Sequence, residues 1–364
     1  MNRKERRSAE KKRRSGGKRS GAADQSVVRA ITAIQGGNLE EGEAILNEVR
    51  RKQPSNVEAK HHLGMILART GRADAGIALL REAVESSPRE ALYWNNLAAS
   101  CLAVQRSAEA AEAAQKAAEL DPGYVMAWEN LGFARRDLHQ PEEAVAAFAA
   151  AARLQTLDAS TRRSWAACLL ELGRYDAAVE KARDALRSDP HAPDALGTLG
   201  LALMQQGKDD DARSALKQSL EIAPDNPAAA ISYGRLLLRQ PDGRENGLRW
   251  LRRATSVVPR SAPAWRILAE ALFRADLVEE ATAAIDRAAK LAPGDPAIAA
   301  LQSRITGAVP AANSGAIPGL DDLVVSVSTA APVAPPPART PAPAKPAGEG
   351  TGPVFDLSIL KIRE

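Results

Sequence analysis

Histidine and cysteine are the rarest side chains of this 364-residue chain that could bind a transition metal or act in catalysis. They are His61, His62, His139, His191, Cys101 and Cys168. His61 and His62 are adjacent, and adjacent side chains on a helix diverge by about 100°, so the pair cannot chelate one ion. No other pair has metal-ligand spacing, and no glycine-rich phosphate loop joins a strand to a helix. We therefore expect no enzymatic activity, no cofactor and no metal.

The regular spacing in the chain belongs instead to packing residues. Trp94 and Trp128 lie 34 residues apart, as do Asn96 and Asn130. A fixed period of this length indicates tandem helix pairs, each of which buries its apolar face against its neighbours. Trp265 recurs at the same repeat position, so we interpret these tryptophans as packing residues and not as a cage for a cation.

Small residues and prolines mark the two helices of each repeat. A small residue in the first helix would let the second helix approach closely, and a proline would separate one repeat from the next. The first set is Ala30, Gly64, Ala98, Gly132, Ala166, Gly200, Gly234 and Ala269. The second helix has Gly42, Gly76, Ala110, Ala144, Ala178, Ala212, Gly247 and Ala281. The closing prolines are Pro54, Pro88, Pro122, Pro190, Pro224, Pro259 and Pro293.

This pattern resembles the tetratricopeptide repeat (TPR) family over residues 23–295. The resemblance implies an all-α, right-handed α-solenoid of tandem antiparallel helix pairs. The eight expected repeats are 23–56, 57–90, 91–124, 125–158, 159–192, 193–226, 227–261 and 262–295. Thr156 stands where a proline is expected, and the seventh repeat has one extra residue near 241–246. Residues 296–306 are expected to form a capping helix, which completes a solenoid over 23–306.

Both ends of the chain differ from the repeats in composition. Residues 1–21 carry ten Lys and Arg against Glu5 and Glu10, a net charge of +8, whereas the whole chain has +4. We expect a disordered basic arm over 1–22, because it has too few apolar residues to bury a face. The alternatives for this arm are adhesion to RNA, ribosomes or an anionic surface, and a role in solubility only. No apolar run reaches the length of a membrane span. The two cysteines favour a reducing, cytoplasmic setting.

Residues 307–364 are rich in Pro and Ala and are expected to be a disordered tail. An apolar island near the C-terminus interrupts this composition with Phe355, Leu357, Ile359 and Leu360. We interpret it as a docking motif, which could bind in cis to the protein's own groove, or in trans to another protein or a second copy.

The family resemblance places the functional surface on the inner face of the first helices. The residues expected there are His62, Asn95, Asn96, Glu129, Asn130, Arg163, Ser164, Thr198, Ser232, Arg235, Arg239, Arg266 and Arg274. A carboxamide has both a donor and an acceptor, so Asn96 and Asn130 could pair with the backbone of an extended peptide. The alternative is that these amides hydrogen-bond the neighbouring helix. The arginines could favour an acidic or phosphorylated segment, or could form a solvated, salt-bridged face.

The carboxylate clamp of chaperone-binding family members requires Lys and Arg at certain positions of the first helices. This sequence has Asn95, Met126 and Glu129 there, so the clamp is not reproduced. The sequence therefore predicts a non-catalytic adaptor or scaffold of bacterial type that binds extended protein segments. Nucleic-acid or ribosome association through the basic arm and self-assembly are the alternatives. Neither the partner nor the oligomeric state follows from the sequence.

Overall fold

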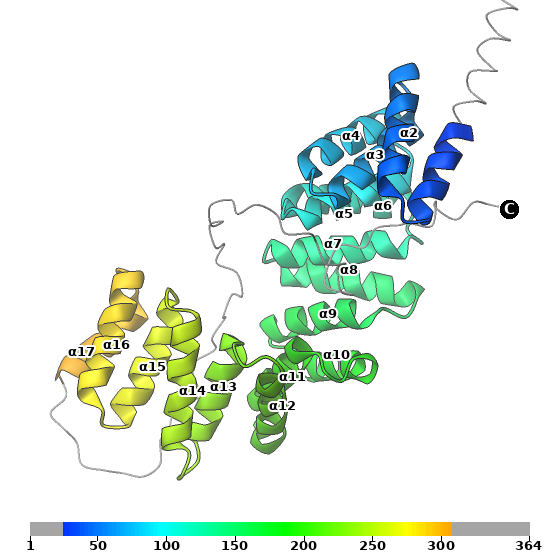
Figure 1. Ribbon diagram of the computed structural model, residues 1–364. Helices are drawn as coiled ribbons and strands as arrows, with labels where there is room; N and C mark the ends of the chain where they lie inside the picture. The colour runs from blue at the N-terminus through cyan, green and yellow to red at the C-terminus, as the bar shows by residue number, and fades with distance from the viewer. Residues whose placement is uncertain (1–24, 308–364) are drawn as a thin grey trace, which may run out of the picture. The chain divides into compact units, whose positions relative to one another are not determined.

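The fold of the chain is a series of helix pairs, described here from a computed structural model for residues 25–307. Figure 1 shows the helices following one another as antiparallel pairs, and the described residues contain no strand. The first helix spans 25–35. The others are α2 (Leu39–Lys52), α3 (Val57–Arg69), α4 (Ala73–Ser86), α5 (Ala91–Ala103), α6 (Ser107–Leu120), α7 (Val125–Asp137), α8 (Pro141–Leu154), α9 (Ala159–Glu171), α10 (Tyr175–Ser188), α11 (Pro193–Gln205), α12 (Asp209–Ile222), α13 (Pro227–Leu238), α14 (Arg244–Val257), α15 (Ala262–Arg274), α16 (Val278–Leu291) and α17 (Pro296–Gly307).

The described residues form two compact units, an N-terminal unit over 25–157 and a C-terminal unit over 158–307. The boundary directly follows Thr156, at the place where the closing proline is missing. The expected basic arm and the expected tail, including its docking motif, lie outside the described residues.

Within each unit, helices pack in the order that the repeat predicts. In the N-terminal unit, α3, α5 and α7 each pack against the second helix of their own repeat and that of the preceding one. The C-terminal unit repeats this arrangement from α9 to α16. First helices of successive repeats also touch, α3 with α5 and α5 with α7 in one unit, and α9 to α15 in the other. The α-solenoid of helix pairs is thus confirmed in each unit.

Close helix crossings explain the small residues. A Cβ atom added to Gly76 of α4 would lie 2.5 Å from the carbonyl oxygen of Gly64 and 2.7 Å from the backbone nitrogen of Ala68, both in α3. A Cβ atom on Gly132 would lie 2.4 Å from the ring of Phe148. Larger side chains at these crossings would force the two helices apart.

The turn inside each helix pair except the pair of α13 and α14 contains a residue with a positive φ angle, at nearly constant spacing. Glycine occupies this position at Gly37, Gly71, Gly173 and Gly207. Gln105, His139 and Asp276 occupy it in three other repeats, with φ of 59°, 56° and 58°. This left-handed conformation is strained for residues that have a Cβ atom.

We expect Gln105→Gly to stabilise the N-terminal unit by roughly 0.5–1 kcal/mol. Relief of the left-handed strain exceeds the greater flexibility of glycine in the unfolded chain. The matched control is Gly207→Gln, which should destabilise the C-terminal unit by about 1 kcal/mol. Urea unfolding measures both variants. Loss of stability in Gln105→Gly would show that the turn does not carry this strain.

The recurring tryptophans have a structural role. The indole Nε1 of Trp94 donates to the carbonyl oxygen of Pro88 at 2.9 Å. Trp128 makes the same bond to Pro122 at 3.0 Å, and Trp265 bonds the carbonyl of Pro259 at 3.0 Å. Each tryptophan therefore ties the start of a first helix to the closing proline before it, which agrees with its interpretation as a packing residue.

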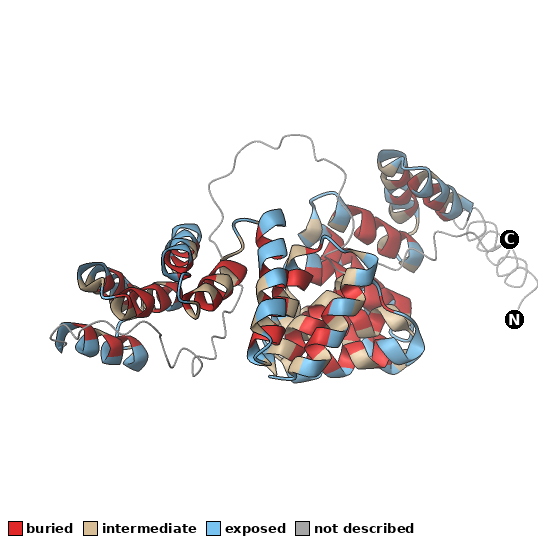
Figure 2. Ribbon diagram, turned by 90° about the horizontal axis from the view of Figure 1, so that it is seen from below, coloured by how far each residue is buried: buried red, intermediate tan, exposed pale blue. Residues whose placement is uncertain are grey.

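Helix α17 ends the described solenoid. The Asp295 carboxylate accepts bonds from the backbone nitrogens of Ala297 and Ile298, at 2.8 and 3.1 Å. Ile298, Leu301 and Ile305 are buried, and α17 packs on α15 and α16. Figure 2 shows buried residues on one side of the outer helices and exposed residues on the other. Helix α17 therefore covers the apolar side of the eighth repeat, as a capping helix does.

Candidate functional site

In the N-terminal unit, buried polar side chains connect the first helices α3, α5 and α7. The amide nitrogen of Asn96 lies 3.0 Å from Nε2 of His61. Asn95 donates to Asn96 Oδ1 at 3.4 Å, and Asn130 donates to Asn95 Oδ1 at 2.9 Å. All three asparagines have no exposed surface. We call this chain of contacts, made by His61, Asn95, Asn96 and Asn130, the amide ladder.

Burial sets the charge state of the two adjacent histidines. His61 and His62 are 1% and 3% exposed, and their rings lie 4.9 Å apart. Burial holds the pKa of His61 well below its usual value, and the nearby His62 lowers it further. Burial also lowers the pKa of His62 to about 4. Both side chains are therefore neutral at pH 7.

The ring of His61 is held from two sides. Since an amide nitrogen only donates, Nε2 of His61 accepts from Asn96 and the ring proton is on Nδ1. The ring of Tyr93 packs against His61 at 4.4 Å. The Nδ1 atoms of both His61 and His62 are buried and have no hydrogen-bond partner among the described residues.

The remaining predicted residue of this unit, Glu129 on α7, is 7% exposed. The structure thus places the N-terminal part of the predicted groove inside the helix packing and joins most of it into one hydrogen-bonded set. Because Asn95, Asn96 and Asn130 are covered, a ligand could reach them only if neighbouring side chains moved. Whether they contact a peptide stays a prediction.

In the C-terminal unit, the predicted residues are more open. Thr198 and Arg266 are partly exposed, and Arg163 is partly exposed and pairs with Asp189 at 3.2 Å. Ser164 and Ser232 are buried, and Ser232 donates to the carbonyl of its own helix.

The other predicted arginines of this unit are engaged by acids or buried. Arg239 lies 2.9 Å from Asp209 of the preceding repeat, and Arg274 lies 2.7 Å from Glu270 one turn earlier on α15. Arg235 is 5% exposed. No hydrogen bond or ion pair between described residues involves the Arg266 side chain. Among the predicted arginines of this unit, Arg266 is thus the one that is partly exposed and has no bonded partner among the described residues.

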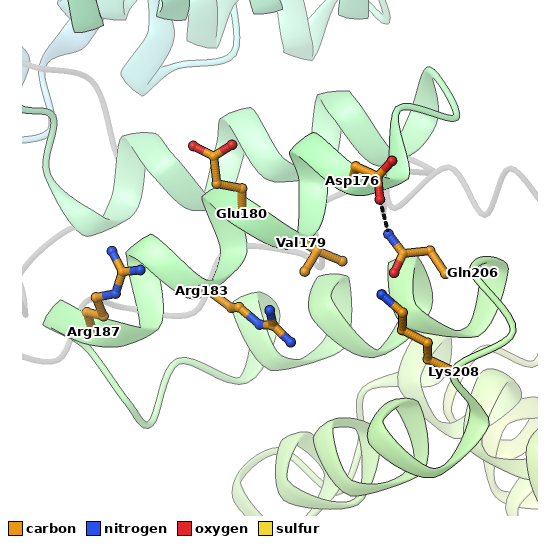
Figure 3. A pocket seen from close by; sticks show the side chains of 7 residues that line it. All are labelled: Asp176, Val179, Glu180, Arg183, Arg187, Gln206 and Lys208. Atoms are coloured by element: carbon orange, nitrogen blue, oxygen red, sulfur yellow. Dashed lines mark hydrogen bonds between the residues drawn. The ribbon is translucent and has the colours of Figure 1, made fainter.

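A shallow surface pocket of about 320 Å³ lies on the second helix α10, away from all predicted site residues. Its lining residues are Asp176, Val179, Glu180, Arg183, Arg187, Gln206 and Lys208. Figure 3 shows Gln206 bonded to Asp176, at 2.9 Å. The lining mixes both signs of charge, and the sequence pattern had no signal for it because its residues come from an exposed helix and a turn.

A sequence profile of the family described as Tetratricopeptide repeat matches residues 27–91, 69–125, 130–193, 164–227, 197–254 and 234–296. The chain belongs to the tetratricopeptide repeat family. No curated protein sequence matches this TPR chain significantly.

Solved structures share the TPR fold. The APC/C hetero-tetramer Cut9-Hcn1 has 16% identity and a TM-score of 0.56, with 73% of this chain and 52% of that chain covered. The Pseudomonas aeruginosa pilF structure has 20% identity and a TM-score of 0.51, with 61% and 99% covered. The present chain therefore spans about half the length of the first of these structures.

Family membership gives the general role. TPR proteins bind protein or peptide partners and are typically non-catalytic scaffolds. No three metal-ligating side chains come together within residues 25–307. In the same part of the chain, no helix has the length and apolarity needed to cross a membrane.

Proposed function

We propose that this TPR protein is a non-catalytic adaptor that binds extended protein segments on the inner face of its first helices. The observation that carries the proposal is that polar side chains recur at one position of the first helices in each unit, where apolar residues would only pack. They run from His62, Asn96 and Asn130 to Ser164, Thr198 and Ser232. Thr198 is partly exposed, so this position presents a hydrogen-bonding group where an apolar residue would offer none.

The two units contribute differently to the proposed surface. In the N-terminal unit, the amide ladder sets the spacing of α3, α5 and α7, and we propose that Asn96 and Asn130 act mainly by holding these helices in register. In the C-terminal unit, Thr198 and Arg266 are partly exposed, so a bound backbone or carboxylate can reach them directly. Cys101 and Cys168 are buried and form no disulfide with each other, which supports the cytoplasm as the site of action.

The test uses a twelve-residue peptide selected from a phage-displayed random library against the full chain. We expect Thr198→Ala combined with Arg266→Ala to weaken its affinity about tenfold, because a hydrogen bond and a charged contact are lost. The matched control is Arg183→Ala with Lys208→Ala, which changes two exposed cations of the pocket on the second-helix side. Equal affinities for the wild type and the Thr198/Arg266 variant would contradict the proposed surface.

The basic arm supports a second candidate, which is association with RNA or another anionic surface. Its net charge of +8 within 21 residues is opposed by a net charge of −4 in the rest of the chain. Binding of this kind weakens steeply with salt. If the selected peptide binds with an affinity that salt abolishes and that deletion of residues 1–21 removes, the arm and not the first-helix face is the binding site.

A further inference from the structure

The seventh repeat differs from its neighbours in charge. Residues 227–261 carry seven arginines against Asp242 and Glu245, whereas the flanking repeats 193–226 and 262–295 have more acids than bases. The arginines are Arg235, Arg239, Arg244, Arg249, Arg252, Arg253 and Arg260. Arg235 and Arg239 belong to the first-helix face described above, so the excess positive charge is on α14 and the turn that follows it.

Three of these arginines share one exposed face of α14. Arg249, Arg252 and Arg253 are three and four residues apart, so their side chains leave the helix on the same side. All three are exposed. We call them the α14 arginine face. The three residues lie within about one helical turn along α14, so their side chains can reach a ligand with two or three neighbouring anionic groups.

The present partners of this face are weakly held. Arg252 pairs with Glu280 at 2.7 Å and Arg253 pairs with Asp225 at 3.0 Å. The side chains of the two acids are 52% and 76% exposed. Exposed ion pairs contribute little to stability, so a ligand carboxylate can replace either acid at small cost. Arg249 has no hydrogen bond or ion pair with another described residue.

An aromatic group adjoins these charges. The guanidinium of Arg253 lies 5.8 Å from the ring centre of Trp250. Tyr233 of α13 packs edge-to-face against the same ring at 5.8 Å. Trp250 is partly exposed, so an apolar side chain next to the ligand's acids can contact it. Trp and Arg together are the residue types enriched where protein partners bind most strongly.

We propose that the α14 arginine face docks a short acidic protein segment, separately from the first-helix surface. The segment has two or three neighbouring Asp or Glu side chains and one apolar side chain against Trp250. A long polyanion such as RNA fits this face less well, because Asp225, Glu245 and Glu280 lie around it and would repel further phosphates. A short acidic segment replaces Asp225 or Glu280 at the arginines that these acids now hold, and it brings fewer further charges near them than a long polyanion does.

The test probe is an octapeptide with three consecutive glutamates followed by a photoreactive benzoylphenylalanine, added to the full chain. We expect crosslinks within residues 244–260. The substitutions Arg249→Ala, Arg252→Ala and Arg253→Ala together should weaken binding at least tenfold. A probe with glutamines in place of the glutamates should bind the wild-type chain at least tenfold more weakly than the glutamate probe does. The corresponding triple lysine variant should retain part of the affinity, since charge remains but the bidentate geometry is lost.

The matched control changes two other exposed cations of the same unit, Arg183→Ala with Lys208→Ala, and should bind the probe like the wild type. Crosslinks confined to residues 1–21 or to the first helices would overturn the proposal. It would also fail if the triple alanine variant bound the probe with unchanged affinity. A single-stranded dodecanucleotide that bound more tightly than the probe and lost its affinity in the same variant would assign the face to nucleic acid instead.

Discussion

Lowering the pH from 7.5 to 5.5 is expected to destabilise the N-terminal unit by about 3 kcal/mol. The folded pKa values of His61 and His62 lie below 6.5, at about 4 for His62. Their stabilising contribution is therefore fully present above pH 6.5 and is lost as the pH falls toward the folded values. At pH 5.5 both histidines are neutral when folded and mostly protonated when unfolded, and each costs on the order of 1–2 kcal/mol.

The measurement is the opening free energy of α3 and α5 by hydrogen exchange at both pH values. The variant His62→Leu should remove about half of the pH dependence, whatever its effect at pH 7.5. His191→Gln is the control, because His191 is exposed. Working above pH 5 keeps most carboxylates ionised. A pH dependence that is the same in His62→Leu and in the wild type would show that the buried pair is not its source.

Gly76→Ala is expected to destabilise the second repeat by about 3 kcal/mol. The new methyl group would meet backbone atoms of Gly64 and Ala68, which cannot rotate away, so α3 and α4 must separate. Gly197→Ala is the matched control at another buried helical glycine. Its nearest neighbours would be Ser219 Oγ at 3.6 Å and Asn226 Nδ2 at 3.9 Å, so we expect a gain of roughly 0.5–1 kcal/mol from helix propensity.

The same substitution tests how far damage spreads. Repeats in a solenoid contact only their neighbours, so faster hydrogen exchange in Gly76→Ala should be confined to α2, α3, α4 and α5. Exchange in the C-terminal unit should remain at its wild-type rate. An equal loss of protection in both units would contradict nearest-neighbour stability.

The sequence predicted the helix pairs because their requirements are local and periodic. At Gly64, Gly76 and Gly132, an added Cβ atom would lie 2.8, 2.5 and 2.4 Å from an atom of the paired helix, so these positions require glycine. The bond from Trp94 to the Pro88 carbonyl likewise explains why the two residue types recur together. Such features depend on one repeat and the next, and a fixed period reveals them.

The contacts of the candidate site were harder to predict, because they depend on side-chain direction. Asn130 bonds Asn95, and the amide of Asn96 lies against His61. The sequence placed His62 in the groove and did not anticipate the role of His61. The turn residue Gln105 also escaped notice, since the left-handed position is held by glycine in only four repeats and by Gln105, His139 and Asp276 in three others.

The α14 arginine face was partly visible in the sequence as a dense group of arginines. Its exposure and its pairs with Glu280 and Asp225 needed coordinates. Ion pairs between repeats, such as Arg239 with Asp209, also join residues about one period apart. Sequence alone does not tell which charges in neighbouring repeats meet.

Hydrogen exchange with a bound peptide tests the central claim most directly. The peptide is a dodecamer selected from a random phage-displayed library against the triple alanine variant of the α14 arginine face, which removes the second proposed site. If the first helices bind extended segments, the peptide should slow exchange in the first helices of one unit, α3, α5 and α7 or α9, α11, α13 and α15. Protection confined to residues 1–21, or to second helices such as α10 and α12, would contradict the proposed adaptor surface.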